Sequence, residues 1–371
     1  MKLQSQLALL RRMDWLLCGA IVALAVVSVL FIYSASYRGP GQRMPDFYRM
    51  QMVWFGIGVA LYVVTALIDY RLICQWASVW YVLAVGLLLL VLAVGAKVHG
   101  SRSWLGWGGY GVQPAEFAKL AVIVAVSYYL FHRTPEVRRQ WSTLGGTLTV
   151  VGMPLLLILA QPDLGSAMVL MPIAFGLMFV AGVRVKHLVV VMLVGLALLP
   201  MAWLKFKDYQ KARITVFMNP NRDPLGAGWN LNQSLIAVGS GGLHGKGYLQ
   251  GTQNLLGYLP RTVTPNDFLF SVIAEEKGFV GSACVVGLYG VILFTGLRIA
   301  ANARDRLGML LATGVVAMLF FHVFINVGMT IGLMPITGLP LPLLSYGGSF
   351  VLASMTALGL LQNVWIHRRT Y

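Results

Sequence analysis

Asp267 stands where a long polar stretch, residues 205–266, meets the next apolar segment of a chain that is otherwise mostly apolar. The stretch is rich in glycine and carries several cations, including Arg213, Lys246 and Arg261. A carboxylate beside such a segment is a candidate general base, because proton abstraction needs a carboxylate within reach of a hydroxyl and a pKa near the working pH. Partial burial would raise the pKa of Asp267, and Arg261 would oppose that change. The alternative is that Asp267 caps the following helix, since aspartate is a favoured N-cap residue.

A second pair of ionisable residues, Glu116 and Lys119, lies near the start of an apolar segment that opens with Pro114. Residues three apart share one helix face, so the two side chains can form an ion pair. A charged side chain inside a membrane span costs at least ~2.5–3.5 kcal/mol, which makes both residues functional candidates. Lys119 could contact a phosphate while Glu116 holds it in place, or the two could form a buried structural pair. The sequence leaves both interpretations open.

Other acidic residues fit structural roles as well as chemical ones. Asp163, in the tight connection Gln161-Pro162-Asp163-Leu164-Gly165, suits the positive end of the helix that follows it. Glu275, Glu276 and Lys277 lie well inside a later apolar segment. We interpret these three as a structural group at a broken or water-lined part of that helix.

Two segments of unusual composition could line a site. Ser240–Gly247 is similar to a phosphate-binding loop, but that motif needs a glycine where this chain has Ser240, and a Ser or Thr where it has Gly247. Its backbone amides could still cradle a diphosphate. Three prolines in 335–342 preclude a regular helix there, and irregular backbone at membrane depth is tolerated only when buried in protein or lining a cavity. Further polar candidates are Gln233 in the long polar stretch, Asn326 in the apolar segment before Pro335, and Ser345.

The apolar segments that must position these residues recur from end to end of the chain. Its 371 residues are 58% hydrophobic and only 11% charged, whereas soluble domains are about 25% charged. Since a bilayer span takes roughly 20 apolar residues, we predict an all-α polytopic membrane protein with about ten transmembrane helices in one integral domain, residues 1–371. The predicted spans are 15–34, 50–68, 77–96, 115–131, 144–160, 166–182, 188–204, 267–297, 308–334 and 344–366.

The predicted topology follows from the span count and the basic residues. An even number of spans puts both termini on one side, and the positive-inside rule makes that side cytoplasmic, because Lys and Arg concentrate at the termini and in alternate short loops. Residues 205–266 then form a long extracytoplasmic loop between spans seven and eight, with helix-like pieces near 205–218 and 229–238. Trp104, Trp107 and Tyr110 in the outer loop 97–114 are predicted to lie at the membrane interface.

Several classes of partner and cofactor are not indicated. The net charge of +16 is distributed over span ends and the long loop, without the basic arm or aromatic-basic strip of a nucleic-acid binder. Three cysteines form no CxxC pair and six histidines show no HExxH spacing, so no metal site is predicted. The N-terminus is interpreted as a retained first helix, because no small-residue cleavage site follows its basic residues.

Motifs along nearly the whole chain resemble those of a known family, the SEDS membrane glycosyltransferases (RodA, FtsW and SpoVE). The loop sequences and short N-terminus are most similar to RodA, the elongation member, although a role in division stays open. One departure is that the family often has His-Thr before the aspartate, where this chain has Val263-Thr264-Pro265-Asn266. The motifs that carry the resemblance lie at 113–119, 161–165, 223–228, 239–247, 266–268 and 339–349.

The resemblance implies a peptidoglycan glycan-strand polymerase in the bacterial cytoplasmic membrane. Such an enzyme joins the disaccharide units of a lipid-linked precursor, lipid II, to the nascent glycan with inversion, and Asp267 matches the carboxylate that deprotonates the acceptor hydroxyl. The resemblance also implies a class B penicillin-binding protein as partner. No cofactor is implied beyond a divalent cation, Mg²⁺ or Mn²⁺, that could accompany the lipid diphosphate. Cations are needed near the leaving diphosphate, and the candidates are Lys119, Arg213, Lys246, Arg102 and Arg261. The other candidate substrate-binding residues are Glu116, Asp163, Gln233 and Ser345.

Two functions of other classes compete with this one. A lipid II flippase or transporter would also have paired intramembrane charges and broken helices, but no inverted repeat is evident and the polar residues gather on the outer side. A non-catalytic scaffold for a penicillin-binding protein is the third hypothesis. Glycan polymer made by the purified protein would separate the polymerase from both alternatives.

Overall fold

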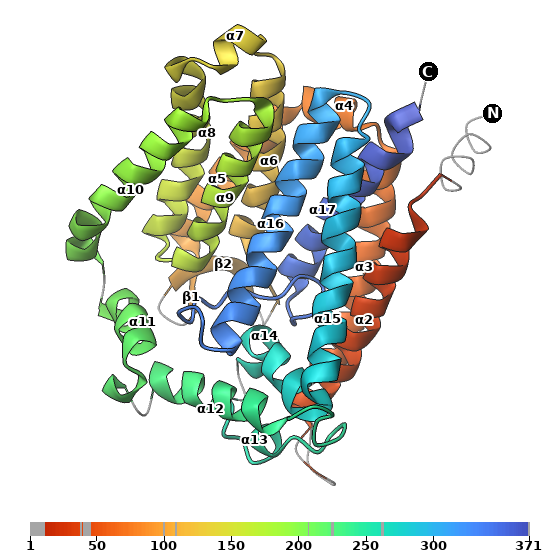
Figure 1. The fold of residues 1–371 in the computed structure, drawn as a ribbon, viewed down its shortest axis with the longest axis vertical. Coiled ribbons are helices and arrows are strands. Elements are labelled where there is room, and N and C mark those ends of the chain that lie inside the picture. Colours follow the sequence, from red (N-terminus) through yellow and green to blue (C-terminus); the bar gives the residue numbers. More distant parts are fainter. Residues whose placement is uncertain are drawn as a thin grey trace.

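The computed structural model describes residues 12–37, 39, 46–98, 101–107, 110–206, 208–223, 226–260 and 263–369. Within these ranges, nine helices are long and apolar enough to cross a membrane, and they coincide with nine of the predicted spans. They pack side by side as one bundle (Figure 1). Their bounds are α2 (Trp15–Ser36), α3 (Phe47–Leu67), α5 (Ala77–Val94), α6 (Pro114–Phe131), α8 (Trp141–Ala160), α9 (Leu164–Ala181), α15 (Leu269–Ala301), α16 (Arg306–Thr330) and α17 (Gly348–Ile366).

The predicted span at 188–204 falls on α10 (Val185–Lys205), which differs from the others. It has 21 residues, and most of its described side chains are exposed. Figure 1 shows α10 at the edge of the molecule, splayed away from the bundle.

The most buried spans, α6, α16 and α17, form the centre of the bundle. Small residues allow their close approach, as is usual where helices pack in lipid. A Cβ added at Gly314 of α16 would lie 2.6 Å from the side chain of Ile123 in α6. Pro114 occupies the first turn of α6, where its missing N–H costs nothing because that position has no helical acceptor.

The extramembrane elements divide between the two ends of the bundle. At one end lie α11 (Asp208–Met218), η1 (Pro220–Arg222), α12 (Ala227–Ser240), α13 (Thr252–Leu255) and α14 (Thr264–Asp267) (Figure 1). Helices α11 and α12 are the two pieces predicted within the long loop. At the other end lie α4 (Tyr70–Gln75), α7 (Pro135–Arg138), η2 (His367–Arg369) and the two ends of the described chain.

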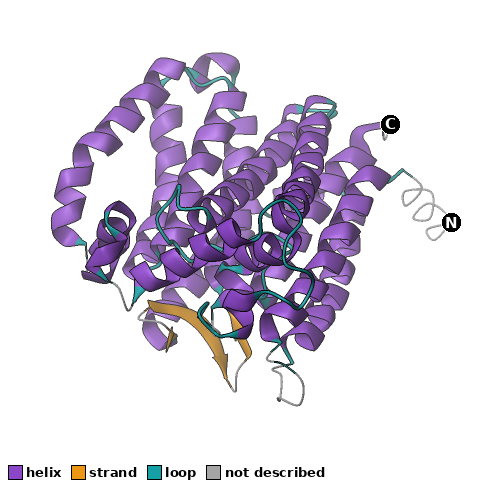
Figure 2. Cartoon of the chain, turned by 60° about the horizontal axis from the view of Figure 1, so that its bottom comes forward, coloured by secondary structure: helices purple, strands orange, loops and turns teal. Residues whose placement is uncertain are grey.

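A small antiparallel sheet, which the sequence did not predict, occupies the end that carries α11–α14 (Figure 2). Its strands β1 (Ala96–Val98), β2 (Ser101–Trp107) and β3 (Tyr110–Val112) are ordered β1-β2-β3. Ala96 pairs with Trp104, and Leu105 pairs with Val112. The connection between α5 and α6 is therefore folded and lies at that end of the bundle.

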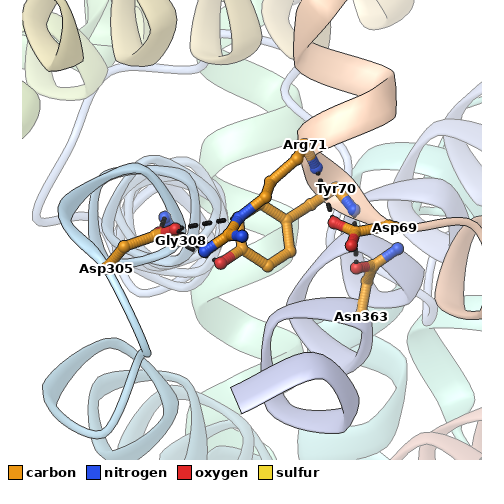
Figure 3. Close-up of polar contacts among 6 residues, drawn as sticks. All are labelled: Asp69, Tyr70, Arg71, Asp305, Gly308 and Asn363. Atoms are coloured by element: carbon orange, nitrogen blue, oxygen red, sulfur yellow. Dashed lines mark hydrogen bonds and ion pairs between the residues drawn. The ribbon is translucent and has the colours of Figure 1, made fainter. Parts of the chain in front are cut away.

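At the opposite end, the carboxylate of Asp305 connects α4 to α16 (Figure 3). It caps α16 by accepting the Gly308 N–H at 2.9 Å, and it also accepts the Tyr70 hydroxyl at 3.0 Å and Arg71 Nη2 at 2.6 Å. Asn363 of α17 accepts the Tyr70 N–H at 3.0 Å. Burial opposes ionisation of Asp305, but these donors together hold its pKa below the usual value.

We predict that Asp305→Ala lowers stability by about 1–3 kcal/mol at neutral pH, because it removes an N-cap and an ion pair together. A carboxylate with a lowered folded-state pKa stabilises above its unfolded pKa of about 3.9, and that contribution is lost as the pH falls through the folded pKa. The difference in apparent Tm between wild type and variant should therefore shrink from pH 7 towards acid. Asp69→Ala is the control, since the Asp69 carboxylate accepts the Arg71 N–H and no other hydrogen bond from the described part of the chain. Equal losses in the two variants would contradict the prediction.

Candidate active site

A cavity of about 650 Å³ opens at the end of the bundle that carries the sheet and α14. Its size lies within the range of ligand-binding pockets, about 300–1,000 Å³. The walls come from α3, β2, α14, the 335–347 segment and the first turn of α17. The polar lining residues are Asp46, Gln113, Asn266 and Asp267, and the aromatic ones are Phe47, Trp54, Trp104, Tyr346 and Phe350.

Asp267 lines this cavity as the last residue of α14. The chain then turns at the buried Phe268, which is the N-cap position of α15. The prediction that Asp267 could cap the long helix is therefore wrong, because α14 inserts a separate turn before it. The Asp267 main chain is fixed by its N–H bond to the Val263 carbonyl at 2.8 Å and by Asn326 Nδ2, which donates to the Asp267 carbonyl at 3.1 Å.

The Asp267 carboxylate accepts no hydrogen bond from any residue in the described ranges, and it is partly buried. A Cβ added at Gly338 would lie 3.6 Å from Asp267 Oδ2, and Gly338 has a φ of +72°. The glycine thus keeps the 335–347 segment close without crowding the acid. Burial raises the pKa of Asp267 to about 6, while the positive charge of Arg213 opposes the rise. A carboxylate with this pKa suits general-base catalysis near neutral pH.

Arg213 is the predicted cation that the structure places near Asp267. It reaches from α11 to the 335–347 segment, where Nη1 donates to the Thr337 carbonyl at 2.8 Å, next to Gly338. Its guanidinium cannot lose its proton at any working pH. The long loop therefore delivers a permanent positive charge beside the acid.

Asp163 lies behind the cavity wall and is not among its lining residues. Its Oδ1 accepts the Ser166 N–H at 3.0 Å, so it caps α9 as the structural alternative predicted. Its Oδ2 accepts Gln113 Nε2 at 2.9 Å. Because Gln113 lines the cavity, Asp163 orients a wall residue.

Glu116 and Lys119 form the buried ion pair that was one of the two predicted alternatives, with Nζ 2.7 Å from Oε2. Nζ also lies 2.9 Å from His322 Nε2, and His322 Nδ1 lies 3.2 Å from the Pro340 carbonyl. Since the ammonium can only donate, Nε2 is the acceptor and Nδ1 carries the proton towards Pro340. Lys119 has no exposed surface, so its contact with a phosphate stays a prediction.

Glu116, Lys119 and His322 together support one wall of the cavity. Pro340 and Phe350 line the cavity, and the His322 ring packs on Phe350 with centroids 4.9 Å apart. His322 was not among the residues predicted from the sequence, because its spacing from other histidines matches no metal-binding motif. Its position inside an apolar span was the signal available, since ionisable residues there are functional candidates.

The glycine-rich loop 239–247 interlocks with the break in α15 and does not line the cavity. The N–H groups of Lys246 and Gly247 donate to the carbonyls of Glu275 and Glu276, both at 3.0 Å. A Cβ added at Gly245 would lie 2.2 Å from the Glu276 carbonyl oxygen. The interpretation of this loop as a phosphate cradle is wrong for these two amides, because the α15 backbone already occupies them.

Lys246 also serves this interlock, since its Nζ lies 2.7 Å from Glu275 Oε1. Glu276 accepts the hydroxyl of Ser34 from α2. Both acids are buried at the point where Gly278, with a φ of +64°, breaks α15. The predicted structural role of the acidic pair agrees with these contacts.

The remaining predicted residues lie at varied distances from the cavity. Arg102 is exposed on β2, two residues before Trp104, whose ring lines the cavity. Ser345 Oγ accepts the Leu341 N–H at 2.9 Å and supports the 335–347 segment. Gln233 is buried on α12, and Arg261 lies outside the described residues.

Of the three aromatics predicted to lie at the membrane interface, Trp104 lines the cavity, and its interfacial position stays a prediction. Strand β2 turns this side chain over the cavity, where it is a wall residue. The side chains of Trp107 and Tyr110 lie outside the described residues. Within the described part of the chain, no three His, Cys, Asp or Glu side chains gather in a way that could hold a metal ion.

Comparisons with known proteins agree on one family. A family model described as Cell cycle protein, covering FtsW, RodA and SpoVE, matches residues 14–370. Peptidoglycan glycosyltransferase MrdB of Escherichia coli (strain K12) is 38% identical over 352 residues, which cover 94% of this chain and 92% of that protein. Peptidoglycan glycosyltransferase RodA of Treponema pallidum (strain Nichols) is 34% identical over 423 residues, with coverages of 95% and 97%.

A solved structure agrees with the sequence comparisons. It is described as showing the structural coordination of polymerization and crosslinking by a peptidoglycan synthase complex. Its chain superposes with a TM-score of 0.81 at 32% identity, covering 97% of this chain and 99% of that one. The fold described above is therefore shared over nearly all of the chain.

Proposed function

The chain belongs to the FtsW, RodA and SpoVE family, and on that premise we propose that its outer cavity is where glycan strands are polymerised, with Asp267 as general base. The chain is a peptidoglycan glycosyltransferase, as its relatives are named. The observation that carries the assignment of the site is the position of Asp267. Its carboxylate lines a ligand-sized cavity, caps no helix and has a pKa of about 6.

The proposed reaction uses Asp267 and the cation beside it. Asp267 takes the proton from a hydroxyl of the acceptor sugar while that oxygen bonds to the anomeric carbon of the donor. The bond from this carbon to the diphosphate breaks on the opposite face, which inverts the configuration. The proton remains on Asp267, and the diphosphate leaves with the electron pair. Arg213 would stabilise the charge that develops on the leaving group.

The proposed substrate is lipid II, whose sugars suit a cavity with aromatic walls and a few polar groups. The cavity opens beside α14 and the sheet, and this end of the bundle lies opposite both ends of the described chain (Figure 1). We propose that this end faces outward across the bacterial cytoplasmic membrane and that both termini are cytoplasmic, which the concentration of basic residues supports. A crosslinking penicillin-binding protein is the proposed partner, supported by the solved structure of a peptidoglycan synthase complex.

The proposed divalent cation would accompany the diphosphate. The described residues do not fit a metal site built by the protein itself, since no three ligands gather. No step of the proposed reaction is assigned to the ion.

The test of this function is polymerisation by the purified full-length protein in detergent, with lipid-linked disaccharide-peptide as the only substrate. Glycan polymer resolved on a gel would support the glycosyltransferase. Movement of the lipid across vesicles without polymer would favour a flippase. If the protein made no polymer and moved no lipid, the result would favour a non-catalytic scaffold for the crosslinking enzyme.

The pH dependence of polymerisation should report the ionisation of Asp267. Because its pKa of about 6 is raised, the base form is lost as the pH falls through 6, and the initial rate should drop about tenfold for each further pH unit. Above about pH 7 the rate should level off. Arg213 lowers this pKa, so Arg213→Gln should move the inflection to higher pH. Initial rates measured from about pH 5 to pH 8 check the fall in rate and the shift of the inflection. An inflection at the same pH in wild type and Arg213→Gln would contradict the predicted effect of Arg213.

A further inference from the structure

A second cavity, of about 670 Å³, lies at the end of the bundle opposite Asp267. It is enclosed by the start of α2, the last turn of α15 and the end of α17 with η2. Its charged lining residues are Arg12, Asp14, Arg298 and Arg368. The proposed glycosyl transfer does not use it, because the reacting groups lie at the other end of α15.

Arginines outnumber acids among the described lining residues of this cavity, where Arg12, Arg298 and Arg368 stand beside Asp14. Asp14 is already engaged, because its Oδ1 accepts the Leu17 N–H at 3.1 Å as the cap of α2 and its Oδ2 accepts Arg298 Nη2. Arg298 Nε is a buried donor without an acceptor in the described part of the chain. A buried guanidinium donor of this kind calls for an anion, since Arg stays charged.

An aromatic ring organises two of these cations. The Arg298 guanidinium lies 5.0 Å from the centroid of the Trp365 ring, and Arg368 lies over the same ring. Stacking of this kind fixes the guanidinium planes, which then present paired N–H groups to a phosphate. The cavity is therefore built for an oxyanion and is more than a concentration of surface charge.

One side of the rim of the cavity is apolar. Trp15 and Leu16, which begin the span α2, line it and are 68% and 52% exposed. Tryptophan at the start of a span lies at the level of the lipid headgroups. A ligand here would meet arginines at one side and hydrocarbon at the other. A soluble anion would leave that apolar rim unused.

We propose that this cavity binds the phosphate headgroup of an anionic phospholipid from the leaflet on the side of the termini. Basic pockets between helix ends are suited to such headgroups. The phosphate would pair with Arg298 and Arg368 beside Trp365, with Arg12 at the exposed rim. The acyl chains would lie along the exposed apolar face of α2.

Native mass spectrometry of the delipidated full-length protein, titrated with dioleoylphosphatidylglycerol or dioleoylphosphatidylcholine, tests this proposal. We expect Arg298→Gln/Arg368→Gln to weaken phosphatidylglycerol binding at least tenfold. Arg12→Gln should weaken it about threefold without disturbing the Asp14 pair. Phosphatidylcholine should bind weakly to all forms. Because a ligand stabilises the state that binds it, phosphatidylglycerol should also raise the apparent Tm of the wild type more than that of either variant.

The matched control is Arg133→Gln/Arg139→Gln, which removes two exposed cations from the loops on the same side of the bundle but outside the cavity. We expect this variant to keep wild-type affinity within about twofold. Equal weakening in the control and the cavity variants would show general surface attraction and overturn the proposal. Unchanged affinity in Arg12→Gln and the double variant would also overturn it. Displacement of the lipid by inorganic pyrophosphate at comparable affinity would assign the cavity to a soluble phosphate instead.

Discussion

Asp267→Asn is expected to lower the rate of glycan polymerisation by a factor of about 10²–10⁴, the usual contribution of a positioned general base. The amide keeps the size and the main-chain contacts of Asp267 but cannot accept a proton. Asp267→Glu should retain more activity than Asn, because it keeps a carboxylate that is displaced by one methylene. The measurement is the initial rate of polymer formation by the purified protein with lipid-linked substrate.

The apparent Tm of Asp267→Asn shows whether a loss of polymerisation comes from lost catalysis or from misfolding. A raised folded-state pKa means that the ionised form of Asp267 is disfavoured by the fold, and this cost is present above the folded pKa of about 6. At neutral pH, Asp267→Asn should therefore have an apparent Tm equal to or above that of the wild type. Asp69→Asn, at the other end of the bundle, is the control and should polymerise normally. A stable Asp267→Asn protein with wild-type rate would rule out the base.

The second large effect is expected at the buried pair beneath the cavity. Lys119→Met should destabilise the protein by about 3–5 kcal/mol, because it leaves the Glu116 carboxylate buried without its cation. His322 would lose its donor at the same time. Glu116→Gln/Lys119→Met removes both charges, and we expect it to recover a large part of that loss. Apparent Tm values of the two single variants and the double variant provide the measurement.

The double variant also separates the two interpretations of Lys119. If the pair acts only by supporting Pro340 and Phe350 through His322, polymerisation should return together with stability. Recovered stability without recovered polymerisation would instead support contact between Lys119 and a phosphate. Losses that simply add in the double variant would contradict the coupling expected of a buried pair.

Sequence patterns predicted the elements well because bilayer spans impose a composition that can be read locally. Nine predicted spans coincide with membrane-length helices, and α11 and α12 match the two helical pieces expected in the long loop. The exceptions have physical reasons. Strands β1 and β3 have three residues each, and the seven residues of β2 do not alternate polar with apolar. Helix α14 separates Asp267 from α15 through a break that the apolar pattern does not mark.

The sequence by itself determined the class of protein, because bilayer spans need long apolar runs, and it indicated the family through motifs along nearly the whole chain. It also made Asp267 the candidate base, by resemblance to that family. Only the tertiary structure decided which candidates share a site. Arg213 reaches Asp267 through the 335–347 segment, while Lys246 turns to Glu275 and Lys119 lies beneath the cavity floor. Residue type and spacing cannot specify these partners, since each side chain pairs with whichever buried opposite charge or carbonyl the helix packing brings near.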